Sequence, residues 1–201
     1  ANALVTGANK GIGLETARRL AAMGFNVWLG ARDAERGEAA AKALRNEGLD
    51  VEWLALDVAS DDSVAAAART LTARVSSLDV LVNNAGIAIA RNIEDTSLEE
   101  WRRTMAVNLD GVFFGCQEGI KLMKKSGGGS IINLSSIDGI IGEAELAAYC
   151  ASKGGVRTLT KAVAVHCAEK RYGIRCNSIH PGYIWTPQTE NYLRDLGIGG
   201  V

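Results

Sequence analysis

The chain has 201 residues, of which 47% are hydrophobic and 22% are charged, values typical of a folded globular domain. A formal net charge of −1 excludes a strongly basic surface, so we expect neither nucleic acid nor an anionic membrane as a partner. The chain shows no apolar run of membrane-spanning length and no signal-peptide pattern at its start, which indicates a cytoplasmic protein.

Short apolar runs alternate with amphipathic segments along the chain. Most of the runs are continuously apolar, as in parallel strands that are covered on both faces. Strands are predicted at residues 3–7, 26–30, 51–56, 79–84, 130–135 and 174–180. Helices are predicted at residues 12–23, 34–46, 61–75, 98–124 and 149–171. This order predicts one doubly wound α/β domain over residues 1–201, with a mostly parallel, Rossmann-type sheet.

Several residues mark where the helices begin and where regular structure should end. Ser97 and Glu100 have the spacing of a capping box, and Asp33 can cap the second helix. Pro181 and Pro187 both follow the last predicted strand, where we expect the chain to leave regular structure.

The four cysteines show no CxxC pair and no neighbouring histidine. This spacing predicts neither a metal site nor a disulfide framework. We expect the cysteines to act as small buried hydrophobic residues in a reducing compartment.

A glycine-rich loop, TGANKGIG, connects the first predicted strand to the first helix. Gly7 can form the tight turn, Gly11 lets a pyrophosphate approach the backbone, and Gly13 permits close packing of the helix. The start of the helix offers free N–H groups to phosphates. A tight loop without a ligand would need the same glycines, so this pattern alone leaves both interpretations open.

Four motifs together resemble those of the short-chain dehydrogenase/reductase family. TGANKGIG, NNAG, YCASK and HPG occur in the order and spacing of that family, over essentially the whole chain. The first half is more similar to carbonyl reductases, and the second to cyclic-alcohol and hydroxysteroid dehydrogenases. The resemblance implies hydride transfer between a nicotinamide cofactor and a ketone or secondary alcohol.

The end of the second strand bears on which nicotinamide is used. Ala31 stands where NAD enzymes of the family carry an acidic residue, and Arg32 follows it. Together with Lys10, Arg32 suits the 2′-phosphate of NADP(H), which we therefore expect as the preferred cofactor. The alternative for Arg32 is a solvated charge at a helix start. NAD(H) stays possible, because relatives of the second half often use it.

The resemblance also implies a set of cofactor contacts in the loops that follow the strands. Asp57 could instead form a turn, and the asparagines of NNAG would also stabilise their own loop. The implied contacts are Gly7, Asn9, Lys10, Gly11, Ile12, Gly13, Arg32, Asp57, Val58, Asn84, Ala85, Gly86, Tyr149, Lys153, Pro181, Gly182, Ile184 and Thr186.

Tyr149 and Lys153 are four residues apart on a predicted helix and therefore share one face. By resemblance, Tyr149 is the acid/base and Lys153 binds the nicotinamide ribose. A cation about 4 Å away contributes roughly 4 kcal/mol at an effective dielectric of ~20, or about three pKa units. We therefore expect Lys153 to bring the pKa of the Tyr149 phenol from ~10 to near 7.

Two further residues complete the implied catalytic group. Ser136 lies thirteen positions before Tyr149 and matches the family's substrate-orienting serine, whereas Ser135 should face the opposite side. Asn108 is unfavourable within a helix, so we expect a buried amide that satisfies backbone groups. By resemblance it also holds a water that relays protons from Lys153.

The substrate is encoded more weakly than the cofactor. Besides Ser136 and Tyr149, the segments 139–146 and 183–185 should line its pocket, with Glu143, Tyr183 and Trp185 as contacts. These segments predict a small hydrophobic or alicyclic carbonyl or alcohol substrate, steroids included.

Two expectations concern the assembly and the ends of the chain. By resemblance, the helices at 98–124 and 149–171 pack against their symmetry mates in a homodimer. The family normally continues beyond residue 201 with a substrate-covering lid and a last strand, so either this sequence is incomplete or the protein lacks both. Alternatives to an enzyme are a nucleotide-binding sensor without turnover and a truncated or designed scaffold of the same fold.

Overall fold

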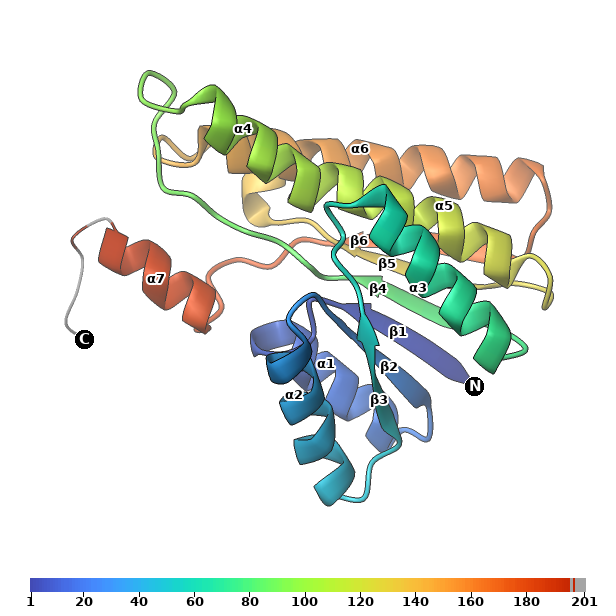
Figure 1. Ribbon diagram of the computed structural model, residues 1–201. Coiled ribbons are helices and arrows are strands. Elements are labelled where there is room, and N and C mark those ends of the chain that lie inside the picture. Colours follow the sequence, from blue (N-terminus) through green and yellow to red (C-terminus); the bar gives the residue numbers. More distant parts are fainter. Residues whose placement is uncertain (196, 198–201) are drawn as a thin grey trace.

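A computed structural model describes residues 1–195 and 197 of the chain. Six parallel strands form one sheet in the order β3-β2-β1-β4-β5-β6, and helices cover both faces (Figure 1). The strands are β1 (Asn2–Thr6), β2 (Asn26–Ala31), β3 (Val51–Ala55), β4 (Val80–Asn83), β5 (Gly129–Leu134) and β6 (Ile174–Ile179). The helices are α1 (Gly11–Ala22), α2 (Ala34–Asn46), α3 (Asp61–Arg74), α4 (Leu98–Met105), α5 (Gly111–Met123), α6 (Ala147–Glu169) and α7 (Pro187–Asp195). The predicted doubly wound architecture is confirmed.

The inner strands are mostly apolar because they contribute side chains to two separate cores, whereas β6 contributes to one core only. On β1, Ala3 and Val5 belong to the core formed with α1 and α2. Leu4, between them, belongs to the core formed with α3, α5 and α6 on the other face. Figure 1 shows the two groups of helices on opposite sides of the sheet.

The helix predicted at 98–124 is interrupted, and the prediction of one continuous helix is wrong at this point. Ala106–Asp110 form a π-helical turn between α4 and α5. Within this π-helical segment, the Asn108 side chain forms two hydrogen bonds with the backbone of Ile87, one as acceptor and one as donor. These bonds offset the poorer backbone geometry of a π turn, which is frequent at functional sites.

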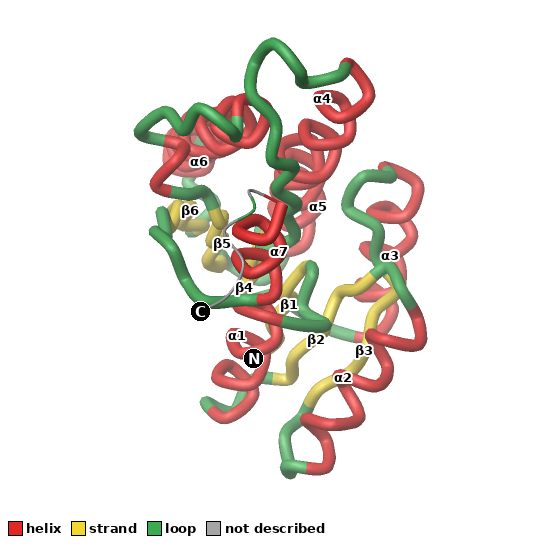
Figure 2. The backbone as a smooth tube through the Cα atoms, turned by 90° about the vertical axis from the view of Figure 1, so that its left-hand side faces the viewer, coloured by secondary structure: helices red, strands yellow, loops and turns green. Residues whose placement is uncertain are grey.

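The chain was also expected to leave regular structure after β6, and this prediction is wrong for its last part. Pro187 begins helix α7, a position that proline suits because its missing N–H would have no partner there. The Thr186 side chain accepts a hydrogen bond from the backbone N–H of Thr189 in the first turn. In Figure 2, α7 lies across the carboxyl ends of the strands, and its Tyr192 packs against Leu146.

The cysteines are free thiols, and three of them are buried in the core. Cys116, Cys167 and Cys176 pack there as the predicted small hydrophobic residues, whereas Cys150 is partly exposed. In the described part of the chain, no three or more His, Cys, Asp or Glu residues are grouped so as to hold a metal. No helix described by the structure is long and apolar enough to cross a membrane.

Helix α5 lies close to the sheet because glycine recurs at every fourth position of its inner face. Gly111, Gly115 and Gly119 pack against Val58, Asn83 and Leu81, respectively. A Cβ on Gly119 would lie 2.7 Å from a Leu81 methyl group. The stripe of glycines thus sets how near α5 approaches β4.

Gly115→Ala tests this constraint. The added Cβ would overlap the amide oxygen of Asn83 and lie 3.0 Å from its Cγ. Asn83 cannot easily move, since it is buried and donates to Asn133 Oδ1 at 2.9 Å. We expect the substitution to lower the free energy of unfolding by about 2 kcal/mol in urea titrations.

Gly154→Ala is the matched control, because the nearest atom to its Cβ would be 3.8 Å away. This variant should be neutral or gain up to about 1 kcal/mol from helix propensity. Equal stabilities of the two variants would contradict the packing role of Gly115.

Candidate active site

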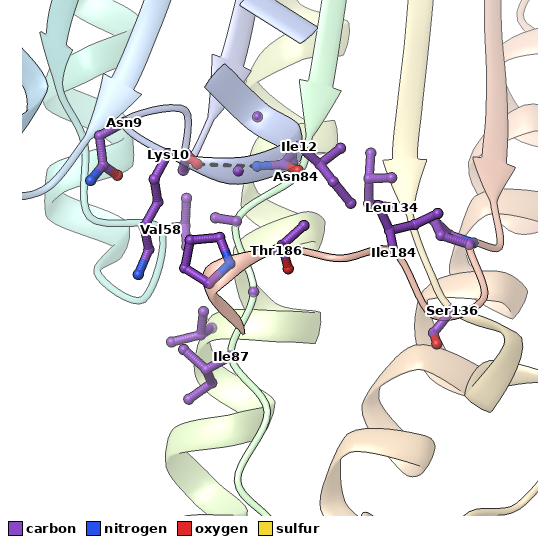
Figure 3. Close-up of a pocket in the computed structure, with 18 of the residues that line it drawn as sticks. Asn9, Lys10, Ile12, Val58, Asn84, Ile87, Leu134, Ser136, Ile184 and Thr186 are labelled. Atoms are coloured by element: carbon purple, nitrogen blue, oxygen red, sulfur yellow. Dashed lines mark hydrogen bonds between the residues drawn. The ribbon is translucent and has the colours of Figure 1, made fainter. Parts of the chain in front are cut away.

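A pocket of about 330 Å³ lies along the carboxyl edge of the sheet and extends to the start of α7 (Figure 3). Every residue assigned to cofactor contact lies in its wall, as does Ser136. The wall also contains eight residues that were not assigned: Ala31, Leu56, Ile87, Val107, Leu134, Ser135, Pro187 and Thr189. The residues among these that end or follow a strand could have been predicted as pocket residues, because the predicted sheet already places them at its carboxyl edge. Val107, Pro187 and Thr189 are brought in only by tertiary contacts.

The glycine-rich loop meets the loop after β4 at close range. Gly7 has a φ of 62°, and a Cβ there would lie 2.7 Å from the Cα of Ala85. A Cβ on Gly13 would overlap the side chain of Asn84. Asn84 donates in turn to the carbonyl oxygens of Thr6 and Gly7, at 2.9 and 3.2 Å. The two loops therefore form one rigid wall, in which Asn84 has the predicted structural role.

Positive groups gather at this end of the pocket. No side chain caps the N-terminus of α1, and its first turn carries no acidic residue. Lys10 and Arg32 are exposed at the pocket wall, and neither forms an ion pair with any residue that the structure describes. Unpaired N–H groups and two cations suit an anionic ligand.

The backbone beside Arg32 is braced by a neighbouring strand. Trp53 on β3 donates from its indole nitrogen to the carbonyl oxygen of Ala31 at 3.1 Å. Gly37 on α2 leaves the space that this indole occupies. Asp33 accepts from the backbone N–H of Arg36, which confirms it as a helix cap.

Asp57, shortly after β3, has the turn-forming role that was considered for it. Its side chain accepts a hydrogen bond from the backbone N–H of Ala59 at 3.1 Å. Asp57 also lines the pocket, next to Val58.

At the other end of the pocket, Lys153 is buried, with 3% of its surface exposed. Its ammonium donates to the carbonyl oxygen of Leu134 at 2.7 Å and lies 5.6 Å from the centre of the Tyr149 ring. A Cβ on Gly86 would be 3.4 Å from this ammonium and 3.5 Å from Asn108 Oδ1. Glycine at position 86 therefore leaves room where these groups converge.

Asn108 is fully buried and has little hydrogen-bonding capacity left. Its amide nitrogen donates to Ile87 O at 2.9 Å and to Ser152 Oγ at 3.1 Å. Its oxygen accepts from the N–H of Ile87 at 2.8 Å. The predicted backbone-satisfying amide is thus present, and only one lone pair of Oδ1 stays available.

The two adjacent serines have different partners. Ser135 donates to the carbonyl oxygen of Lys153 at 2.8 Å, a hydrogen bond to the backbone that occupies its hydroxyl proton. Ser136 lies in the pocket wall, where its hydroxyl donates to Asp138 at 3.1 Å.

Of the predicted substrate contacts, Ser136 and Tyr149 line this pocket, whereas Glu143, Tyr183 and Trp185 lie outside its wall. Tyr183 and Trp185 are 66% and 68% exposed, and Glu143 is partly buried. Tyr192 was not predicted, yet only 8% of its surface is exposed, and it packs in a cluster that includes Tyr149. No motif marks Tyr192, because α7 reaches this cluster only through the tertiary fold.

Comparison with known proteins gives one consistent match. The family model for short chain dehydrogenases matches residues 1–197. An NADP-dependent (R)-specific alcohol dehydrogenase from Lentilactobacillus kefiri is 46% identical over 191 residues, covering 94% of this chain and 75% of that protein. A cyclopentanol dehydrogenase from Comamonas testosteroni is 43% identical over 190 residues, covering 94% and 75%.

Solved structures agree with this match. A gluconate 5-dehydrogenase from Burkholderia cenocepacia, in complex with NADP and tartrate, superposes with a TM-score of 0.89 at 38% identity. The alignment covers 99% of this chain and 76% of that one. This chain is a member of the short-chain dehydrogenase family. It is therefore an NAD(P)-dependent oxidoreductase acting on alcohols or ketones.

In this short-chain dehydrogenase, the predicted lowering of the Tyr149 pKa to near 7 is not met. The pKa of the phenol is raised, mainly by burial and further by Asp138 and Cys150, while the Ser136 hydroxyl opposes the change. The reason is geometric: the Lys153 ammonium faces the ring and is held by Leu134 O. Burial also lowers the pKa of Lys153, from 10.5 to about 8.

The lysine pKa has a consequence for the stability of this dehydrogenase. Between pH 8 and pH 10 the unfolded chain keeps the proton of Lys153, while the folded chain loses it. The unfolded state then binds more protons, so the stability contributed by this group rises with pH. Relative to Lys153→Met, the free energy of unfolding should rise by about 2 kcal/mol over this range, measured in urea at each pH. A constant difference would mean that the ammonium is not desolvated.

Proposed function

We propose that the chain transfers hydride between NADP(H) and a ketone or secondary alcohol, with Tyr149 as the proton donor and acceptor. The observation that carries this proposal is one pocket with two chemically different ends. Lys10 and Arg32 line one end, and Ser136, Tyr149 and Lys153 line the other. Such a pocket can hold a phosphate-bearing cofactor and place its reactive end beside a proton donor.

The residues present fit NADP(H). The uncapped N-terminus of α1 and the glycine loop suit the pyrophosphate, and Arg32 with Lys10 suits a 2′-phosphate. Ala31 leaves no carboxylate at the position that would favour NAD(H). The bound cofactor supplies or accepts the hydride.

The residues at the reacting end divide the remaining work. The Ser136 hydroxyl holds the substrate oxygen, and Tyr149 passes a proton to it or takes one from it. Lys153 has three donors, of which Leu134 O engages one, so two are left for ribose hydroxyls. Asn108 has one lone pair for a water that relays protons from Lys153. A sensor without turnover, or an inert scaffold, is not favoured, because it would need none of these groups.

We propose a small hydrophobic or alicyclic ketone or alcohol as the substrate. The supporting relatives are named for cyclopentanol and for hydroxysteroids, the latter from Mycobacterium tuberculosis at 43% identity. The cluster that joins Tyr149 to α7 is apolar, with Ala90 and Leu146 at its centre.

We further propose that the chain forms a homodimer in the cytoplasm. Phe113 on α5 and Val165 on α6 are apolar and about half exposed on neighbouring helices. Covering such residues against a symmetry mate would stabilise a two-fold interface. Free cysteines fit a reducing compartment. Light scattering at micromolar concentration measures the mass of the assembly.

The function is tested by following NADPH absorbance with a panel of cyclic and open-chain ketones. The parent protein should oxidise NADPH with at least one neutral ketone. Tyr149→Phe removes the proton donor and keeps the ring, so turnover should fall at least a hundredfold while NADPH affinity changes little. Turnover within tenfold of the parent would exclude Tyr149 as the proton donor.

Arg32→Ala tests the choice of cofactor. A charge-assisted bond to the 2′-phosphate contributes about 1.5–3 kcal/mol, and NADH cannot form it. We expect the variant to lose at least tenfold in NADPH affinity and much less in NADH affinity, by fluorescence titration. Asp33→Ala, next to it, should weaken both cofactors equally if at all. Equal losses for Arg32→Ala would make that residue only a solvated surface charge.

A further inference from the structure

Asp138 is hydrogen-bonded to Ser136, the serine that is expected to hold the substrate. The Ser136 hydroxyl donates to Asp138 Oδ2 at 3.1 Å, and the backbone N–H of Asp138 donates to Ser136 Oγ at 3.1 Å. Asp138 lies in a short 3-10 helix, Ile137–Gly139, which follows β5 and has Ser136 as its N-cap. The Asp138 carboxylate thus lies next to the reacting end of the pocket. Neither the sequence motifs nor the function proposed above assigns a role to it.

The backbone of this turn is held on several sides. The carbonyl oxygen of Ser136 forms a hydrogen bond with His180 Nδ1 at 3.1 Å. The backbone N–H of Ile137 donates to the carbonyl oxygen of Pro181 at 2.9 Å. A Cβ on Gly139 would lie 2.8 Å from the carbonyl oxygen of Lys153, so the turn packs tightly on α6. Because its backbone is fixed, the short Asp138 side chain stays beside Ser136.

The distance from Asp138 to a bound substrate follows from these contacts. The Ser136 hydroxyl has a single proton, so to hold a substrate carbonyl it must turn from Asp138 toward that oxygen. The carbonyl oxygen then lies about 3 Å from Oγ and within about 6 Å of the Asp138 carboxylate. No cation of the described residues pairs with Asp138. The Lys153 ammonium hydrogen-bonds to the neutral carbonyl of Leu134 and not to Asp138. Among the described residues, Asp138 therefore has no ion-pair partner at the place where the substrate would bind.

We propose that Asp138 is a specificity-determining residue, which makes the site reject substrates with a carboxylate next to the reacting carbonyl and accept neutral or amine-bearing ones. The proposal rests on the function proposed above. A substrate carboxylate would lie close to a like charge in a partly buried site, where Coulomb repulsion is weakly screened. Glu143 lies on the same side: the pKa of both Tyr183 and Tyr192 is raised mainly by burial, and further by the charges of Glu143 and Asp138.

The same charge acts on the proton donor, which gives a second readout. Burial raises the pKa of Tyr149 most, and the charge of Asp138 raises it further, as does Cys150. The other groups facing the phenol are Ser136, which lowers this pKa, the Lys153 ammonium, and Tyr192 from α7. Removing the Asp138 charge should therefore move the pH midpoint of alcohol oxidation to lower pH.

The test compares reduction of ethyl pyruvate and pyruvate with NADPH in the parent and in Asp138→Asn. The amide can still accept from Ser136 but carries no charge. The ratio of kcat/KM for ester over acid should fall at least tenfold, which corresponds to about 1.4 kcal/mol. Comparing this ester-over-acid ratio in the variant with that in the parent cancels the different intrinsic reactivities of the two compounds. Asp50→Asn, exposed at the opposite edge of the sheet, should leave the ratio unchanged.

Asp138→Glu separates charge from shape, because it keeps the carboxylate and should keep the discrimination. NADPH titration checks that each variant is folded. A ratio within threefold of the parent in Asp138→Asn, or equal losses in Asp138→Asn and Asp138→Glu, would overturn the proposal while ester reduction leaves the proposed function intact. If the parent reduces no neutral ketone, the proposed function fails, and this proposal fails with it.

Discussion

The buried ammonium of Lys153 is the constraint on which the rest of the site depends. A desolvated charge needs close hydrogen-bond partners, and Leu134 O at the end of β5 is one of them. Ser135 binds the backbone of the same lysine, and Gly86 and Gly139 leave the space it needs. The end of β5, the loop after β4 and the start of α6 are therefore held in a single arrangement around one charge.

This arrangement gives the pocket two chemically different ends. The end near α1 carries Lys10, Arg32 and uncapped N–H groups, which suit phosphates. The far end carries the Lys153 ammonium and the Tyr149 phenol, whose pKa is raised mainly by burial, with the Asp138 carboxylate next to Ser136. An elongated cofactor with a phosphate-bearing half and a reactive half would enter this pocket in one orientation, and the substrate would meet a site of different character.

Periodicity in the sequence was sufficient for the elements whose apolar residues recur at a regular spacing. The strands and the helices α1, α2, α3 and α6 were predicted to within about two residues, because their apolar patterns are local. The π turn at Ala106–Asp110 was missed, since the hydrogen bonds that accompany it join Asn108 to Ile87, 21 positions away. Helix α7 was missed because Tyr192 is covered by residues far earlier in the chain.

The sequence by itself determined the family, the parallel sheet and the chemical groups at its carboxyl edge, since motifs and periodicity are properties of neighbouring residues. It also indicated that the paired residues Tyr149 and Lys153 share a helix face. Only the tertiary structure decided the direction of the phenol pKa and the attachment of Asp138 to Ser136 at the pocket. The physical reason is that burial and the distances between charges depend on where the folded chain brings distant segments together, as β5 and α6 do around Lys153.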